Sequence, residues 1–310
     1  MTNAIDETSL DKLAQVIVKT GLNISPGQDV IITASAEALP LLRRVTIEAY
    51  KAGAGLVTAI LGDEEMNRAR YQHASDDSFS HAPGWLYKGM AEAYENNAAR
   101  LHIVADNPMA LANENPEKVG RAAKAKSQAY KPAMTKISNF EINWNIAAYP
   151  GRAWSQLVFP DHAPDAAQAA LADAIFSASR INNDDPTAAW AAQNANLAER
   201  RFWLNTQYFK SLHFVSEHVD LMVGLADGLL WAGGASRAKN GITCKPTIPT
   251  EEVITTPHKQ GGTGSVRASK PLAHQGTLIE GIEVTFENGK LIKARADAGE
   301  EVFLKLIDTD

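Results

Sequence analysis

The first half of this chain alternates helical patterns with short apolar runs, and this rhythm most constrains its fold. The order is a helix around residues 10–17, the strand "VIITAS" at 30–35, a helix at about 40–52, the strand "GLVTAIL", and helices near 83–96 and 116–130 that flank the strand "LHIVAD" at 101–106. "GLNISPGQD" supplies a stop and a turn after the first helix. Strands that alternate with helices predict a mainly parallel sheet with helices on its faces.

The second half changes character. From Pro164 to about Phe209 the pattern is helical and alanine-rich, with a break at "NNDDP", residues 182–186. Strand-like segments then dominate, and Asn288-Gly289 between the last two predicts a hairpin with a type I′ turn. We therefore predict an α/β protein with an N-terminal α/β domain over 1–185 and a mixed α/β domain with an antiparallel hairpin over 186–310.

Composition excludes several classes of protein. The chain has 310 residues, 45% of them hydrophobic, which favours two domains over one. A formal charge of −6 without basic clusters argues against nucleic-acid binding. The single cysteine, Cys244, fits a reducing, cytoplasmic compartment. We expect no signal peptide and no membrane span, because charges interrupt the first thirty residues and no run of about eighteen apolar residues occurs.

The stretch "CKPTIPTEEVITTPHKQ" places two carboxylates, Glu251 and Glu252, between prolines and β-branched residues. If residues 248–254 are extended, Glu252 shares a face with Ile248 and Ile254. A carboxylate on an apolar face is costly to bury unless it is paired, hydrogen-bonded or bound to metal. Of the two, Glu252 is thus the candidate for a functional role, and Glu251 is the better candidate for solvent. The alternative is that both carboxylates are solvated at a strand edge.

Other motifs give weaker indications of a catalytic, metal or phosphate site. His213 and His218 in "HFVSEH" are five residues apart in a strand-like segment, whereas the zinc-protease pattern needs histidines four apart on a helix. "GGTGS" at 261–265 lacks a Gly-Lys-Ser/Thr ending and is followed by a strand, so it predicts a mobile loop. No Gly-x-Ser-x-Gly motif occurs, and Cys244 has no activating neighbour beyond Lys245.

Taken together, several segments resemble the thermophilic-type metalloaminopeptidases, the family of aminopeptidases T and S. In the family's order they are "GLNISPGQDVIITA", "APGWLYKGMAEAY", "VGRAAKAKSQAYKP", "NWNIAAYPGRAWSQLVFP", "DPTAAWAAQNANL", "LLWAGGA", "PTIPTEEVITTPH" and "ASKPLAHQGTLIEGIEVTFENGK". The resemblance runs from about residue 8 to the last residue.

The resemblance implies a cytoplasmic exopeptidase that releases N-terminal amino acids from peptides. Family members have two α/β domains and form homodimers. They hold two divalent metal ions (Co, Zn, Mn or Mg) in the C-terminal metallopeptidase domain, here 186–310. The second glutamate of the Pro-Thr-Glu-Glu motif is a metal ligand in the family, and that position is Glu252.

The remaining ligands of the family lie beyond Asp310. They are a bridging glutamate, a histidine and a His-x-Asp pair, with a nearby tyrosine. We therefore expect the C-terminal domain to be incomplete and the 310-residue chain to be an inactive fragment, because one carboxylate does not hold two ions. The alternative is a non-catalytic α/β scaffold or oligomerisation module.

Overall fold

The computed structural model describes residues 5–274 and 276–308. These residues form two compact units. The first comprises residues up to Asn107, Glu114–Ala195 and Gly234–Glu251. The second comprises Pro108–Asn113, Asn196–Gly233 and Glu252 onward. Within the described residues, no helix has the length and hydrophobicity needed to cross a membrane.

The first unit is built on a five-stranded sheet in the order β10-β4-β3-β1-β2, in which every neighbouring pair is parallel. Its strands are β1 (Val30–Ser35), β2 (Val57–Gly62), β3 (Ala99–Val104), β4 (Trp144–Ala148) and β10 (Thr247–Ile248). A small antiparallel pair, β8 (Ser236–Arg237) and β9 (Thr243–Cys244), belongs to the same unit. The prediction of a mainly parallel sheet is confirmed.

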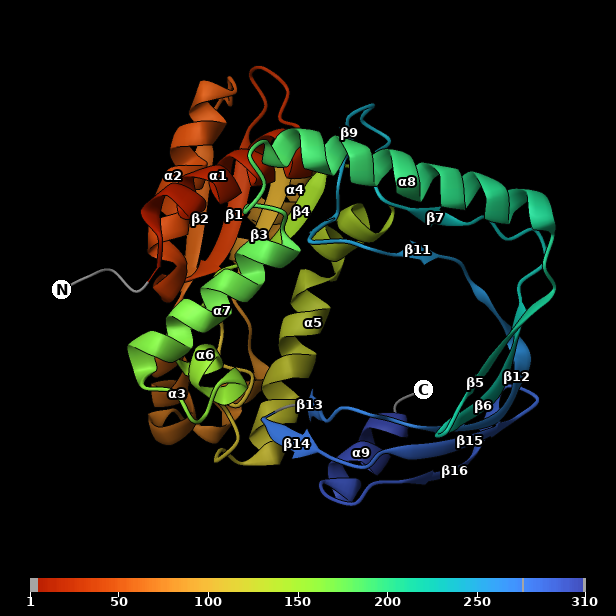
Figure 1. Cartoon of the computed structure of the whole chain (residues 1–310). Coiled ribbons are helices and arrows are strands. Elements are labelled where there is room, and N and C mark those ends of the chain that lie inside the picture. The colour runs from red at the N-terminus through yellow and green to blue at the C-terminus, as the bar shows by residue number, and fades with distance from the viewer. Residues whose placement is uncertain (1–4, 275, 309–310) are drawn as a thin grey trace. The chain divides into compact units, whose positions relative to one another are not determined.

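Helices cover both faces of this sheet (Figure 1). The helices of the first unit are α1 (Glu7–Val16), α2 (Leu39–Lys51), α3 (Glu64–His73), α4 (Gly84–Glu95), α5 (Pro116–Ser138), α6 (Arg152–Val158), α7 (Pro164–Ala178) and the first part of α8 (Pro186–Gln207). A π-helical turn (Ile17–Leu22) and two 3-10 turns (Ala36–Ala38 and Asp76–Ser80) complete it.

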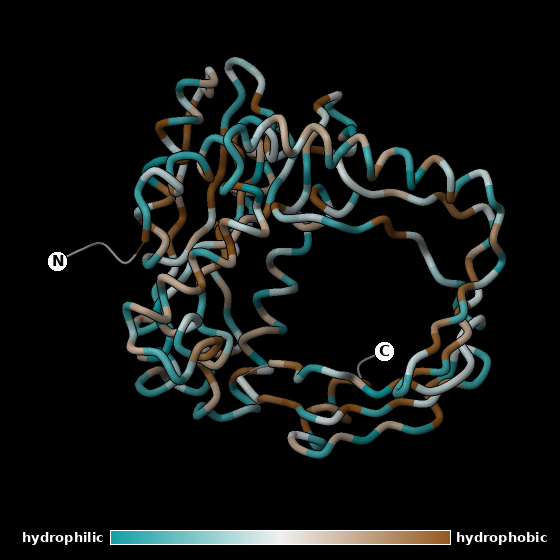
Figure 2. The backbone as a smooth tube through the Cα atoms, viewed as in Figure 1, coloured by the Kyte–Doolittle hydropathy of each residue, from teal (hydrophilic) through white to brown (hydrophobic). Residues whose placement is uncertain are grey.

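Strand β1 explains why the core has two parts. Val30 and Ile32 pack with α1, α2 and α7, whereas Ile31 packs with α4 and α5. Successive side chains of a strand point to opposite faces, so a strand buried on both faces has to be apolar throughout. Figure 2 shows the strands of this sheet as largely hydrophobic, brown segments. The apolar run at the start of β1 therefore fits a strand that is buried on both faces.

The predicted boundary at 185/186 differs from the division into units. Helix α8 starts at Pro186, and its residue Trp190 is fully buried in the first core. Residues 234–251 then return to the first unit, where β10 extends the sheet next to β4. The break "NNDDP" therefore lies inside the first unit, between α7 and α8, because the buried indole ties the start of α8 to the core.

The second unit contains an antiparallel five-stranded sheet in the order β16-β15-β12-β6-β5. Its strands are β5 (Ser211–Ser216), β6 (Val219–Leu225), β12 (Pro257–Arg267), β15 (Glu283–Glu287) and β16 (Lys290–Arg295). The pairs β7 (Ala232–Gly233) with β11 (Val253–Ile254) and β13 (Leu272–His274) with β14 (Thr277–Ile279), and helix α9 (Glu300–Ile307), belong to this unit. Asn288 and Gly289 both have positive φ, 50° and 76°, which confirms the predicted hairpin turn.

The prediction of a mobile loop at residues 261–265 is wrong, because these residues lie inside β12. Gly264 has a φ of +129°, and a Cβ there would overlap the backbone carbonyl of Asp220 on β6. The glycines permit close approach of two strands rather than binding of a phosphate.

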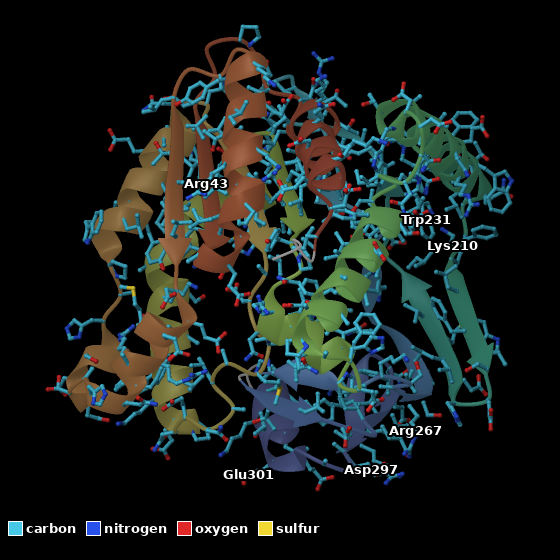
Figure 3. All side chains as sticks on the ribbon, turned by 60° about the vertical axis from the view of Figure 1, so that its left-hand side comes forward. Arg43, Lys210, Trp231, Arg267, Asp297 and Glu301 are labelled. Atoms are coloured by element: carbon cyan, nitrogen blue, oxygen red, sulfur yellow. The ribbon has the colours of Figure 1, made fainter. Side chains whose placement is uncertain are left out.

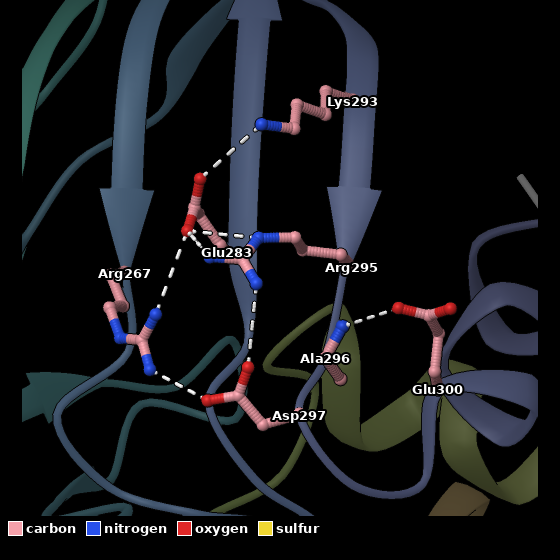
Figure 4. A network of polar contacts seen from close by, with 7 residues as sticks. All are labelled: Arg267, Glu283, Lys293, Arg295, Ala296, Asp297 and Glu300. Carbon is pink, nitrogen blue, oxygen red and sulfur yellow. Dashed lines mark hydrogen bonds and ion pairs between the residues drawn. The ribbon is translucent and has the colours of Figure 1, made fainter.

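An ionic network joins three strands of the second unit at one end of the sheet (Figure 4). Glu283 on β15 accepts hydrogen bonds from Arg295 and forms ion pairs with Arg267 and Lys293. Asp297 lies 2.7 Å from the Arg267 guanidinium. Figure 3 labels both residues. These contacts lower the pKa of Glu283, chiefly through its hydrogen bond to Arg295.

Candidate functional site

The segment that carries the two glutamates is not one continuous strand. Residues 247–248 form β10, which pairs with β4 in the first unit, and residues 253–254 form β11, which pairs with β7 in the second. The connection of four residues breaks the alternation of faces, so Ile248 is buried whereas Ile254 is 56% exposed. The predicted apolar face shared by Glu252, Ile248 and Ile254 is therefore not formed.

The two adjacent carboxylates have different surroundings. Both glutamates are exposed. Glu251 nevertheless has two partners: Arg180 Nη2 lies 2.6 Å from its Oε1, and Gln193 Nε2 donates to its Oε2 at 2.6 Å. No side chain or backbone group in the described part of the chain pairs with the Glu252 carboxylate. Glu251 is thus held in place, whereas the Glu252 carboxylate is exposed to solvent.

Arg180 reaches Glu251 from the end of helix α7. Its backbone is left-handed, with φ 60°, and it follows the last helical residues as the C′ residue of a Schellman motif. In that motif Arg180 N–H donates to Ser177 O at 3.0 Å and Ile181 N–H donates to Phe176 O at 2.8 Å. This position favours glycine, and another residue there costs about 1–2 kcal/mol. Contacts of the Arg180 side chain can offset this cost of the left-handed backbone.

Those contacts include a buried indole. The Arg180 guanidinium carbon lies 4.6 Å from the ring centroid of Trp190, and the Lys245 Nζ lies 4.4 Å from the same centroid. Trp190 Nε1–H donates to Ser179 O at 2.9 Å, which fixes the ring. Glu251 therefore lies beside a cluster of two cations and one aromatic ring.

Lys245 is the unusual member of this cluster. Its side chain is fully buried, and its Nζ has no hydrogen-bond partner among the described residues. Burial lowers the pKa of Lys245 from 10.5 to about 8; repulsion from Arg180 acts in the same direction, and attraction to Glu251 opposes both. The sequence pattern did not indicate Arg180 or Gln193 as partners of Glu251, because each lies more than fifty positions away.

The histidines of "HFVSEH" have ordinary surroundings. His213 Nε2 lies 2.7 Å from Asp220 Oδ1 on the neighbouring strand, and its side chain is half exposed. His218 lies in the turn between β5 and β6.

Comparisons with known proteins place these features in a family. The family model described as "Thermophilic metalloprotease (M29)" matches residues 6–310. Aminopeptidase T of Thermus thermophilus is 47% identical over 97% of this chain and 74% of its own length. Aminopeptidase 2 of Geobacillus stearothermophilus is 38% identical over 98% of this chain and 74% of its own length.

This chain belongs to the M29 metalloprotease family. The structure of wild-type AmpT from Thermus thermophilus agrees with this membership: it superposes with a TM-score of 0.92 at 46% identity and covers 97% of this chain and 75% of that one. The α/β fold predicted for the M29 chain is therefore confirmed at the level of the whole architecture.

The family name implies a bound metal ion, which side chains of His, Cys, Asp or Glu would hold. Across residues 5–274 and 276–308, no three side chains of His, Cys, Asp or Glu come together in a way that would hold a metal ion. Metal sites of hydrolases need about three to five protein ligands. A single carboxylate such as that of Glu252 would be one ligand of such a set.

Proposed function

We propose that this chain carries the fold and part of the catalytic apparatus of a metal-dependent aminopeptidase, an enzyme that releases N-terminal amino acids from peptides. Membership of the M29 family over nearly the whole chain carries the proposal. The relatives with 47% and 38% identity are named aminopeptidase T and aminopeptidase 2. Likeness to these named aminopeptidases supports the substrate class, peptides with a free N-terminus.

We further propose that Glu252 is a ligand of one of two divalent ions (Co, Zn, Mn or Mg). Its carboxylate is exposed and has no partner among the described residues, so both oxygens are accessible to an ion. Because the described residues bring no group of three donors together, we expect the 310-residue chain alone to hold the ions weakly and to be inactive.

Thermal unfolding with and without millimolar Zn²⁺, Co²⁺ or Mn²⁺ tests both statements, together with hydrolysis of leucine p-nitroanilide. We expect a small metal-induced rise in Tm that is lost in Glu252→Gln and kept in the control Glu217→Gln, which replaces another exposed glutamate. An equal rise in both variants would refute the role of Glu252. A rise of many degrees accompanied by cleavage would show that the chain is active as it stands.

A homodimer and a cytoplasmic location are part of the same proposal. Large apolar side chains of the second unit support self-association: Phe202 is 73% exposed, Tyr208 83% and Leu230 77%. The same exposure also suits the alternative of a non-catalytic scaffold or oligomerisation module. Sedimentation velocity combined with the metal-dependent Tm measurement separates the two, because a scaffold associates but its Tm does not respond to metal.

A further inference from the structure

Lys245 has a buried side chain on a firmly held backbone. It lies between β9 and β10 in the first unit. Its N–H donates to Gly21 O at 2.7 Å, and Asn145 Nδ2 donates to its carbonyl oxygen at 2.7 Å. The side chain is fully buried, and its Nζ has no hydrogen-bond partner among the described residues. A lysine is almost never fully buried unless its charge is paired, so this ammonium lacks an expected partner.

The carboxylate that acts on this lysine is already engaged. Arg180 and Glu251 are the charged groups of the described structure whose fields reach Lys245. Arg180 Nη2 lies 2.6 Å from Glu251 Oε1, and Gln193 Nε2 donates to Oε2 at 2.6 Å. Glu251 therefore balances the charge of Arg180, and the cluster keeps a surplus of one positive charge, that of Lys245.

The ring of Trp190 does not replace a negative partner. Lys245 Nζ lies 4.4 Å from the ring centroid, and the guanidinium carbon of Arg180 lies 4.6 Å from the same centroid, so two cations share one ring. Burial, with repulsion from Arg180 added, lowers the pKa of Lys245 to about 8. At pH 7 about nine in ten folded molecules therefore still carry the charge.

A second buried donor belongs to a residue that binds this ring. The carbonyl of Ser179 accepts the indole N–H of Trp190 at 2.9 Å, whereas its buried hydroxyl has no partner in the part of the chain that the structure describes. A hydroxyl rotates to suit an acceptor. A water molecule would accept hydrogen bonds from Lys245 or Ser179 but would leave the surplus charge, whereas an anion removes it.

We propose that the cluster around Trp190 binds one small monovalent anion such as chloride, with the Lys245 ammonium as its main donor and the Ser179 hydroxyl as a second. One negative charge matches the surplus of one positive charge, and complete burial excludes bulky anions. All of these residues belong to the first unit, so the site depends neither on Glu252 nor on a bound metal. Without the anion the buried charge lowers stability, and with it the folded chain is stabilised by mass action.

Thermal unfolding of the full chain at pH 7 tests the site, in sodium chloride against sodium gluconate at equal ionic strength. Gluconate is a bulky monovalent anion that does not fit a buried site. We expect chloride at saturating concentration to raise the Tm of the wild type by about 3–5 °C over gluconate. Lys245→Met should lose this difference, and the control Lys124→Met, which replaces an exposed lysine, should keep it. Ser179→Ala should need several-fold more chloride for the same rise.

A chloride-specific rise of the same size in Lys245→Met overturns the proposal, and so does a wild type that responds equally to both salts. Bromide supplies a measurement that needs no variant. In a crystal of the full chain soaked in sodium bromide, anomalous diffraction should show a peak within about 3.5 Å of Lys245 Nζ. Bromide found at surface sites, with no peak beside Lys245, also overturns the proposal.

Discussion

Lys245 offers the sharpest test of how the first unit is held together. Its side chain is fully buried against Trp190, and its ammonium has no hydrogen-bond partner in the described structure. Replacing it by methionine keeps a long unbranched side chain and removes the charge. The expected effect on the free energy of unfolding depends on pH, and the dependence follows from the pKa of Lys245.

The pKa of Lys245 sets the sign and the size of this pH dependence of the free energy of unfolding. Lys245 has its ordinary pKa of 10.5 when the chain is unfolded and about 8 when it is folded. Between these values the unfolded chain binds the proton and the folded chain does not, so stability rises with pH across this window. Below pH 8 the folded chain also binds the proton, so the buried ammonium lowers the free energy of unfolding by its full amount. The difference amounts to about 3 kcal/mol, at about 1.4 kcal/mol for each factor of ten in the proton affinity.

We therefore expect Lys245→Met to have its largest advantage over the wild type at pH 7, and this advantage to shrink by about 3 kcal/mol as the pH approaches 10.5. Urea unfolding at several pH values measures it, provided that the slope with denaturant stays constant. The control Lys124→Met replaces an exposed lysine of α5 and should show no such trend. A constant gap between Lys245→Met and wild type across pH 7–10.5 would refute the reasoning.

Two further changes test the second unit. Gly264→Ala places a Cβ against the carbonyl of Asp220 and forces a positive φ on alanine, so Tm should fall sharply; Gly62→Ala, where the added Cβ meets no atom within 4 Å, should barely change it. Glu283→Gln removes the centre of the ionic network, so it should lower stability at neutral pH. Because the pKa of Glu283 is lowered in the folded state, mainly by Arg295, that loss should disappear as the pH falls below the folded pKa, and it should shrink in high salt. A loss that persists in acid would contradict this account.

Local sequence determined the regular parts of this protein because their causes are local. The apolar run of β1 predicts a strand buried on both faces, and α2 and α4 lie close to the predicted ranges. Asn288-Gly289 predicts its own turn, since both residues tolerate positive φ. The choice of Glu252 over Glu251 stays a prediction, and the shared apolar face from which the sequence argument started is not formed.

Tertiary structure decided what depends on residues far apart in the chain. No local pattern indicates that residues 247–248 return to pair with β4, or that Arg180 and Gln193 bind Glu251. The free energy of such contacts is set by burial and charge in the folded state, which short-range periodicity does not encode. The different surroundings of the two glutamates therefore arise only when the chain folds back on itself.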